Sequence, residues 1–363
     1  MTYILFLFAI ILGLVFKKSK ICSAYMLTVM VFLAALRTQS ADLENYQVEY
    51  LYGYSSRYFG FDFFTGVFRT IGFSFEQYMI AFYIITYMLL FVAIRLLTQN
   101  VNFTLACYMI YSYGIDAIQM KTCISNVFVL LSFSIVLRCF EDKKKITKKS
   151  LMLLSALLML FGVSLHLSAV YYIVCMVTYL IFYNRPNMSI KAIAIVICLL
   201  LIINGGILPW ILNVFSNLGI IGGMDYFAKF TAKQTSLGFF IPIINIIIIM
   251  FAFYFKKRGD SSFPNGTGFA ISYNTMYPCI LSMWTIVPIM MINLQYYRLF
   301  HPFYLLIYIF FSEKFFVAKC NIYALLSKIL FFVLISFVFI YELPVYDSTL
   351  GALLKYNALL PGL

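Results

Sequence analysis

Long apolar runs separated by short polar connections fill most of this chain. Hydrophobic residues make up 64% of its 363 positions, and charged residues make up only 11%. A soluble domain cannot hide that much apolar surface, whereas about 20 consecutive apolar residues are what a helix needs to cross a bilayer. The pattern therefore predicts an all-α polytopic integral membrane protein and excludes a soluble fold.

The chain has room for about 12 transmembrane helices in one membrane domain that covers residues 1–363. The fourth and fifth spans are the weakest of the set and could form a partly re-entrant pair. Several of the apolar runs are short for a hydrocarbon layer about 30 Å thick. The spans are placed at 2–16, 21–36, 77–97, 102–114, 122–138, 151–165, 167–183, 191–210, 239–255, 275–292, 298–312 and 326–341.

Two longer connections, near 37–76 and 211–238, are rich in aromatic residues and are expected to form outer loops with interfacial helices. The run from Leu43 to Tyr58 predicts one such helix, because Tyr46, Tyr50 and Tyr54 share a helical face. That face either rests against lipid or lines a groove for a sugar or lipid substrate.

Basic clusters set the orientation. Lys17 to Lys20, Lys143 to Lys149 and Lys256 to Arg258 fall on the same side in one alternating assignment, and cytoplasmic loops carry such an excess of Lys and Arg. This bias explains the net charge of +13 without a nucleic-acid partner. The lysines after the first run also argue against a signal peptide and place the N-terminus outside.

The eight cysteines are scattered in or beside apolar runs, with no CxxC pair and no Cys/His cluster. Such spacing disfavours a disulfide framework or a zinc site. We predict no metal and no cofactor.

A few chemistry-bearing residues fall on the predicted outer face. Asp116 followed by Gln119 matches a capping box at a helix start. Lys121 lies just inside an apolar span, where it either extends outward or meets an anion. His166 is the type of side chain most easily tuned to take a proton near neutral pH, and His301, deeper in its span, is the less favoured actor. The candidate site residues are Arg37, Asp42, Asp116, Lys121, His166 and Arg298.

Several short motifs, in this order, resemble those of the EpsG-like, Wzy-type polymerases of bacterial surface polysaccharides. They extend over about residues 30–305, which is most of the chain. Lys121 stands where arginine is usual in that family. The matching elements are Arg37…Asp42…Tyr46, the aromatic stretch 58–64, Asp116-x-x-Gln119-x-Lys121, the segment 165–169 around His166, and Tyr297-Arg298-Leu299-Phe300.

The resemblance implies a glycosyltransferase in the bacterial cytoplasmic membrane, with its active site facing outward. The acceptor is one oligosaccharide repeat unit on undecaprenyl diphosphate, and its hydroxyl displaces that lipid diphosphate from a growing donor glycan. Arg37, Lys121 and Arg298 would bind the diphosphate, because cations stabilise this leaving group. His166, Asp42 or Asp116 would act as the base.

The product would be a capsule, an exopolysaccharide or an O-antigen. Membrane lipid, a flippase and a chain-length regulator are the expected partners. A lipid-linked glycan ligase would use the same charges and stays open. A lipid-linked sugar transporter should carry charges deep inside its spans and twofold internal repetition, neither of which is found. A structural or sensor protein is the remaining alternative.

Overall fold

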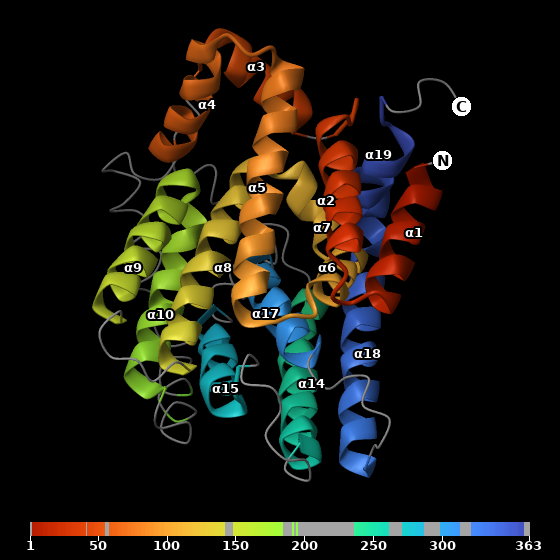
Figure 1. Ribbon diagram of the computed structural model, residues 1–363, viewed down its shortest axis with the longest axis vertical. Helices are drawn as coiled ribbons and strands as arrows, with labels where there is room; N and C mark the ends of the chain where they lie inside the picture. The colour runs from red at the N-terminus through yellow and green to blue at the C-terminus, as the bar shows by residue number, and fades with distance from the viewer. Residues whose placement is uncertain are drawn as a thin grey trace.

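The computed structural model describes residues 2–40, 42–54, 58–141, 148–183, 191, 194, 236–260, 271–286, 298–312 and 321–358. Within these ranges every regular element is a helix, and most helices run along the long axis of the molecule (Figure 1). Two short helices, α3 (Leu43–Tyr52) and α4 (Phe59–Ile71), lie at one end, which we call the α3–α4 end. The protein is a helical membrane protein, as predicted.

Three helices are long and apolar enough to cross a bilayer: α5 (Phe75–Leu97), α8 (Met120–Glu141) and α9 (Lys148–Leu165). Six shorter apolar helices accompany them among the described residues, so the count of 12 spans stays a prediction. α8 is the central helix, with most of its surface buried by neighbours. Hydrogen bonds from Ser125 to the Gly162 carbonyl (2.8 Å) and between Ser132 and Ser155 (2.8 Å) join it to α9.

The predicted span 102–114 is broken in the structure. α6 (Val101–Ile110) is followed by α7 (Tyr113–Ile118), and Ser112 between them has a φ of 81°. Ten residues rise only about 15 Å, half of a hydrocarbon layer. An interrupted backbone at such depth is tolerated only when protein covers it, and both helices are almost completely buried. The re-entrant alternative therefore fits 102–114, whereas 122–138 belongs to the full-length α8.

The first two helices, α1 (Thr2–Val15) and α2 (Lys20–Ala35), form a hairpin beside α6. Its turn is held by Asn102, whose side-chain amide donates to the Phe16 and Ser19 carbonyls (2.5 and 2.9 Å). The amide of Asn100 similarly donates to the Ser312 carbonyl (2.9 Å). These bonds gather the residues that follow α1 and α5 and the last residue of α17 (His301–Ser312) at the end of the bundle opposite α3 and α4.

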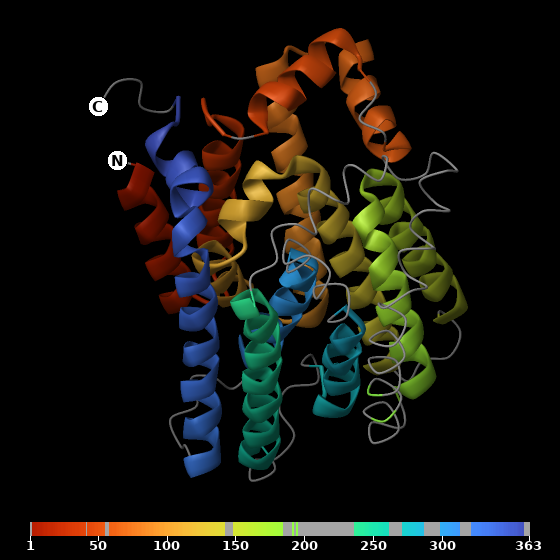
Figure 2. The ribbon, with the colours of Figure 1, turned by 180° about the vertical axis from the view of Figure 1, so that it is seen from behind.

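The remaining described helices complete the bundle. α17 is buried along its whole length, and α14 packs along α18 (Figure 2). Nearly all of the predicted span 191–210 and of the loop 211–238 lies outside the described residues. The helices are α10 (Val170–Phe182) after a 3-10 turn at Leu167–Ala169, α14 (Ser236–Asp260), α15 (Tyr273–Ser282), α17 (His301–Ser312), α18 (Ile322–Glu342) and α19 (Leu350–Lys355).

The interfacial helix predicted over 43–58 is shorter than expected. α3 (Leu43–Tyr52) ends at Gly53, whose φ of 67° is a left-handed stop, and a second helix, α4 (Phe59–Ile71), follows. Tyr46 and Tyr50 are buried against protein, with the Tyr50 ring stacked 4.6 Å from that of Tyr78. The lipid-facing alternative is therefore wrong for these two tyrosines, because α4 and α5 cover that face of α3.

Segments far apart in the chain meet beside α2. The backbone of 36–38 pairs with that of 356–358 through Thr38 N–H to the Tyr356 carbonyl (2.9 Å) and Ala358 N–H to the Leu36 carbonyl (2.8 Å). The start of α1 and the helix α19 lie on the side of α3 and α4 in Figure 1. This short clasp fixes the chain just where Arg37 leaves α2.

Candidate active site

Lys121 meets an anion and does not extend into solvent. Its ammonium lies 2.8 Å from a carboxylate oxygen of Glu49 on α3, and its side chain is only 13% exposed. Three rings surround the same ammonium at 5.2–5.7 Å from their centroids: Phe61, Tyr46 and Tyr58. Rings at this distance attract a cation through their quadrupoles. The first turn of α8 therefore places a positive charge beside α3 and α4, enclosed by one carboxylate and three rings. We call Lys121, Glu49, Tyr46, Tyr58 and Phe61 the cage.

His166 lies beside this cage, in the turn between α9 and the 3-10 segment. Its ring stacks on Tyr58 at 4.9 Å, and Nδ1 lies 2.5 Å from the Ser168 hydroxyl. Burial, followed by the charges of Lys121 and Arg298, lowers the pKa of His166 from 6.5 to about 4. The imidazole is therefore neutral near pH 7. Lys121 and Arg298 lie close enough to His166 to act on it, so the structure gathers these three predicted residues.

Arg37 is buried more deeply than the sequence suggested. Nη1 donates to the Ala34 carbonyl (2.5 Å) and to the Tyr83 hydroxyl (2.8 Å), and Nε donates to Ser40 (3.1 Å). Nη2 is buried without a hydrogen-bond partner, and no carboxylate within 4 Å pairs with the guanidinium among the described residues. A buried guanidinium held by neutral groups alone is electrostatically incomplete and favours an added anion.

Tyr46 links Arg37 to the cage. Asp42, Tyr83 and Arg37 all act electrostatically on its hydroxyl, and the Lys121 ammonium lies over its ring. Asp42 directly precedes α3 and is half-buried, and its side chain makes no capping hydrogen bond to that helix. Five of the six predicted residues thus form one cluster around Tyr46 and His166, at the α3–α4 end.

Asp116 is the sixth, and its expected capping role is wrong. It lies inside α7, which starts at Tyr113, and its carboxylate points into the core. One carboxylate oxygen is 2.7 Å from Nδ1 of His301, and the other accepts the Tyr108 hydroxyl proton (3.0 Å). A tertiary partner 185 residues away has overridden the local pattern. Within residues 116–121, Asp116 therefore belongs to the core and Lys121 belongs to the cluster.

Two partners were not among the predicted site residues: His301 and Glu49. His301 is fully buried, begins α17 and holds that helix to the re-entrant segment through Asp116. Arg298 lies one turn earlier, so the Asp116–His301 contact also fixes where Arg298 stands. Glu49 could have been found from its helical spacing, because it shares the face of Tyr46 and Tyr50 on α3.

A glycine sets the distance between α4 and α9. A methyl group on Gly60 would meet the Ser164 hydroxyl at 2.1 Å and the Ser164 carbonyl carbon at 2.8 Å. Only glycine allows the start of α4 to lie this close to the residues just before His166. This contact brings Tyr58 and Phe61 over the cage.

The cluster combines positive charge, a neutral imidazole beside a hydroxyl, and aromatic walls. Such a site is suited to an anionic leaving group and a proton transfer. The described residues contain no group of three or more His, Cys, Asp or Glu side chains that could hold a metal ion.

The comparisons with known proteins support this description of the chain. Neither the search of curated proteins nor that of solved structures found a match. The sequence profile of the EpsG family matches residues 20–358, which includes every element of the cluster. The order of motifs and the near-complete match agree, and the chain belongs to the EpsG family, a Wzy-like family of polysaccharide polymerases.

Proposed function

We propose that this protein polymerises oligosaccharide repeat units carried on undecaprenyl diphosphate, at the outer face of the bacterial cytoplasmic membrane. The acceptor hydroxyl attacks the anomeric carbon of the donor glycan. The new glycosidic bond forms as the bond to undecaprenyl diphosphate breaks, and the diphosphate leaves with the bonding electrons. The product is a surface polysaccharide such as a capsule, an exopolysaccharide or an O-antigen.

The observation that carries this proposal is the placement of Lys121 and Arg298 around a neutral His166 beneath α3 and α4. A departing diphosphate needs cations in place before it leaves, because fixed charges then stabilise it without reorganisation. Lys121 acts as a point charge, and Arg298 adds a donor fork that suits phosphate oxygens. Arg37, with one unpartnered nitrogen, is the third diphosphate ligand.

The base is the His166–Ser168 pair. The acceptor hydroxyl passes its proton to the Ser168 oxygen while the Ser168 hydroxyl passes its own proton to Nδ1 of His166, 2.5 Å away. A pKa of about 4 makes His166 a weak base, because burial and then the charges of Lys121 and Arg298 lower it. A bound diphosphate offsets these two charges, so His166 becomes a stronger base when the donor is present. Asp42 is the second candidate base.

Asp116 takes a different part in this scheme. Because it is buried and bonded to His301, it does not reach the acceptor. It is a positioning residue that fixes the start of α17 and, through it, Arg298.

Purified protein in lipid bilayers tests the reaction directly. We expect it to lengthen an undecaprenyl-diphosphate repeat unit into a ladder of products without any nucleotide sugar. Arg37→Met, His166→Gln and Arg298→Met should yield single repeats only. The control is Arg69→Met, which removes an exposed cation of α4 outside the cluster. Full-length polymer from all three folded variants would refute the site, and a need for nucleotide sugar would refute the reaction.

The same assay separates polymerase from ligase. A ladder of regularly spaced products indicates polymerisation. One transfer to a different acceptor indicates a ligase.

A further inference from the structure

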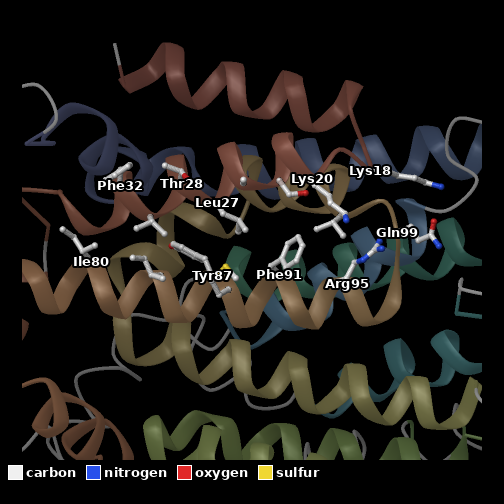
Figure 3. Close-up of a pocket in the computed structure, with 16 residues that line it drawn as sticks. Lys18, Lys20, Leu27, Thr28, Phe32, Ile80, Tyr87, Phe91, Arg95 and Gln99 are labelled. Carbon is white, nitrogen blue, oxygen red and sulfur yellow. The ribbon is translucent and has the colours of Figure 1, made fainter.

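A cavity lies between α2 and α5, on the side of Arg37 that faces away from the α3–α4 end. The cavity there measures about 770 Å³, and its wall is mostly apolar, with Leu27, Ile84 and Phe91 among the residues that form it. Figure 3 shows the side chains of Lys18, Lys20, Arg95 and Gln99 gathered at one end, with Phe32 and Ile80 at the other. The cavity is therefore amphipathic, apolar along its length and cationic at a single end.

We propose that this cavity binds an anionic glycerophospholipid, with its phosphate against Lys18, Lys20 and Arg95 and an acyl chain along α2 and α5. Basic pockets between transmembrane helices on the cytoplasmic side are suited to acidic lipid headgroups. The three cations lie on the end where the basic connections gather. All three side chains are exposed and can reach a headgroup.

The dimensions support a lipid from a single leaflet. Lys20 and Phe32 are separated by 12 residues on one helix, which correspond to about 18 Å. One leaflet of the hydrocarbon layer is about 15 Å thick. An acyl chain that starts at the cations therefore extends along the whole apolar wall and ends near Phe32.

The substrate diphosphate is not the occupant of these cations. Tyr83, which holds Arg37, and Arg95 are 12 residues apart on α5, or about 18 Å along the helix. One headgroup cannot contact both ends. The lipid site is independent of the proposed catalytic step, but it lies between the two helices that meet at the Arg37–Tyr83 contact. A bound lipid fills the space between α2 and α5 below that contact and holds the pair together.

Binding is tested on the full-length protein in detergent, by native mass spectrometry and by thermal unfolding with added lipid. Phosphatidylglycerol should bind and raise the unfolding temperature, and phosphatidylcholine should do so much less. Glycerol phosphate, which carries the charge without acyl chains, should have no effect. Equal effects of the two lipids, or an equal effect of glycerol phosphate, would overturn the proposal.

Variants then locate the site. Lys18→Gln/Lys20→Gln/Arg95→Gln should weaken phosphatidylglycerol binding roughly tenfold or more. The control Lys148→Gln/Lys149→Gln/Lys191→Gln removes three positive charges from positions outside this cavity and should bind as the unmodified protein does. Unchanged binding in the first triple variant, or equal loss in both, would refute the assignment.

A third variant keeps the test decisive if the first triple variant does not fold. Ala24→Trp fills the apolar wall without changing any charge, because Ala24 is exposed and lines the cavity. It should lower the lipid-induced rise in unfolding temperature. A rise that equals that of the unmodified protein would mean that the acyl chain does not occupy the cavity.

Discussion

The carboxylate of Asp116 lies 2.7 Å from Nδ1 of His301, deep in the bundle, and joins the re-entrant segment to α17. The side chains are 5% and 0% exposed. The pair holds one end of the element that carries Arg298, although neither member faces the open part of the cluster. A contact buried in the bundle thus fixes where Arg298 lies at the α3–α4 end.

Asp116→Asn distinguishes positioning from catalysis. Asparagine has the same shape and can keep one bond to His301 and one to Tyr108, so polymerisation should stay within a few-fold of the original rate. Asp116→Ala leaves buried polar groups unpaired and should lower stability by about 1–3 kcal/mol. Thermal unfolding and the polymer assay check both variants. An inactive but fully stable Asp116→Asn protein would make Asp116 a base.

The protonation of His166 gives a second test. Because its pKa of about 4 lies below the value of 6.5 that an unfolded chain would show, its contribution to stability is full above pH 6.5 and is lost as the pH falls toward 4. The unfolding temperature should therefore drop more steeply between pH 7 and pH 4.5 in the unmodified protein than in His166→Gln, a comparison that thermal unfolding at each pH provides.

The charge of Lys121 should affect the pKa of His166, which NMR can follow as the pH is varied. The chain has only two histidines, so histidine-labelled protein gives two resolvable NMR signals. Lys121→Gln should move the pKa of His166 upward toward 6.5, since one of the cations that depress it is gone. Lys149→Gln, distant from the cluster, is the matched control. An unchanged titration in Lys121→Gln would mean that Lys121 does not act on His166 and that burial and Arg298 lower its pKa.

Glu49 competes with substrate for Lys121. Its carboxylate lies 2.8 Å from the Lys121 ammonium, so in the proposed mechanism a diphosphate that binds Lys121 must displace it. Glu49→Gln should lower KM for the lipid-linked donor a few-fold and leave kcat near its original value. Glu76→Gln removes an exposed carboxylate at the start of α5 and should change neither constant. A rise in KM for Glu49→Gln would show that Glu49 serves substrate binding itself.

Two glycines of α4 form a matched pair. Gly60→Ala puts a methyl group into Ser164, should move Tyr58 and Phe61 away from Lys121, and should lower stability by about 1–3 kcal/mol, with loss of polymer. Gly66→Ala meets nothing within 4 Å and should be neutral or stabilise α4 by up to about 1 kcal/mol. Equal behaviour of the two variants would contradict the close packing of α4 on α9.

The sequence grouped Arg37, Asp42, Lys121, His166 and Arg298, because basic loops indicate which charges share one end of a membrane protein. It also placed Asp116 in this group, although Asp116 lies in the core. It could not supply the partners that fold them together. Helical spacing places Glu49 on the face of Tyr46 and Tyr50, but nothing local marks Lys121, 72 residues away, as its partner. The sequence left a re-entrant pair open at the fourth and fifth spans but did not place the break at Ser112. A serine with positive φ is held there by the surrounding structure rather than by its own preference.

The clasp between 36–38 and 356–358 bears on how the protein is made. α2 is made long before residues 356–358, so the backbone around Arg37 stays without this pairing until the ribosome has passed residue 358. At ordinary elongation rates this delay is on the order of half a minute. The backbone beside Arg37 therefore lacks its partner strand segment while the helices from α3 to α18 are being made.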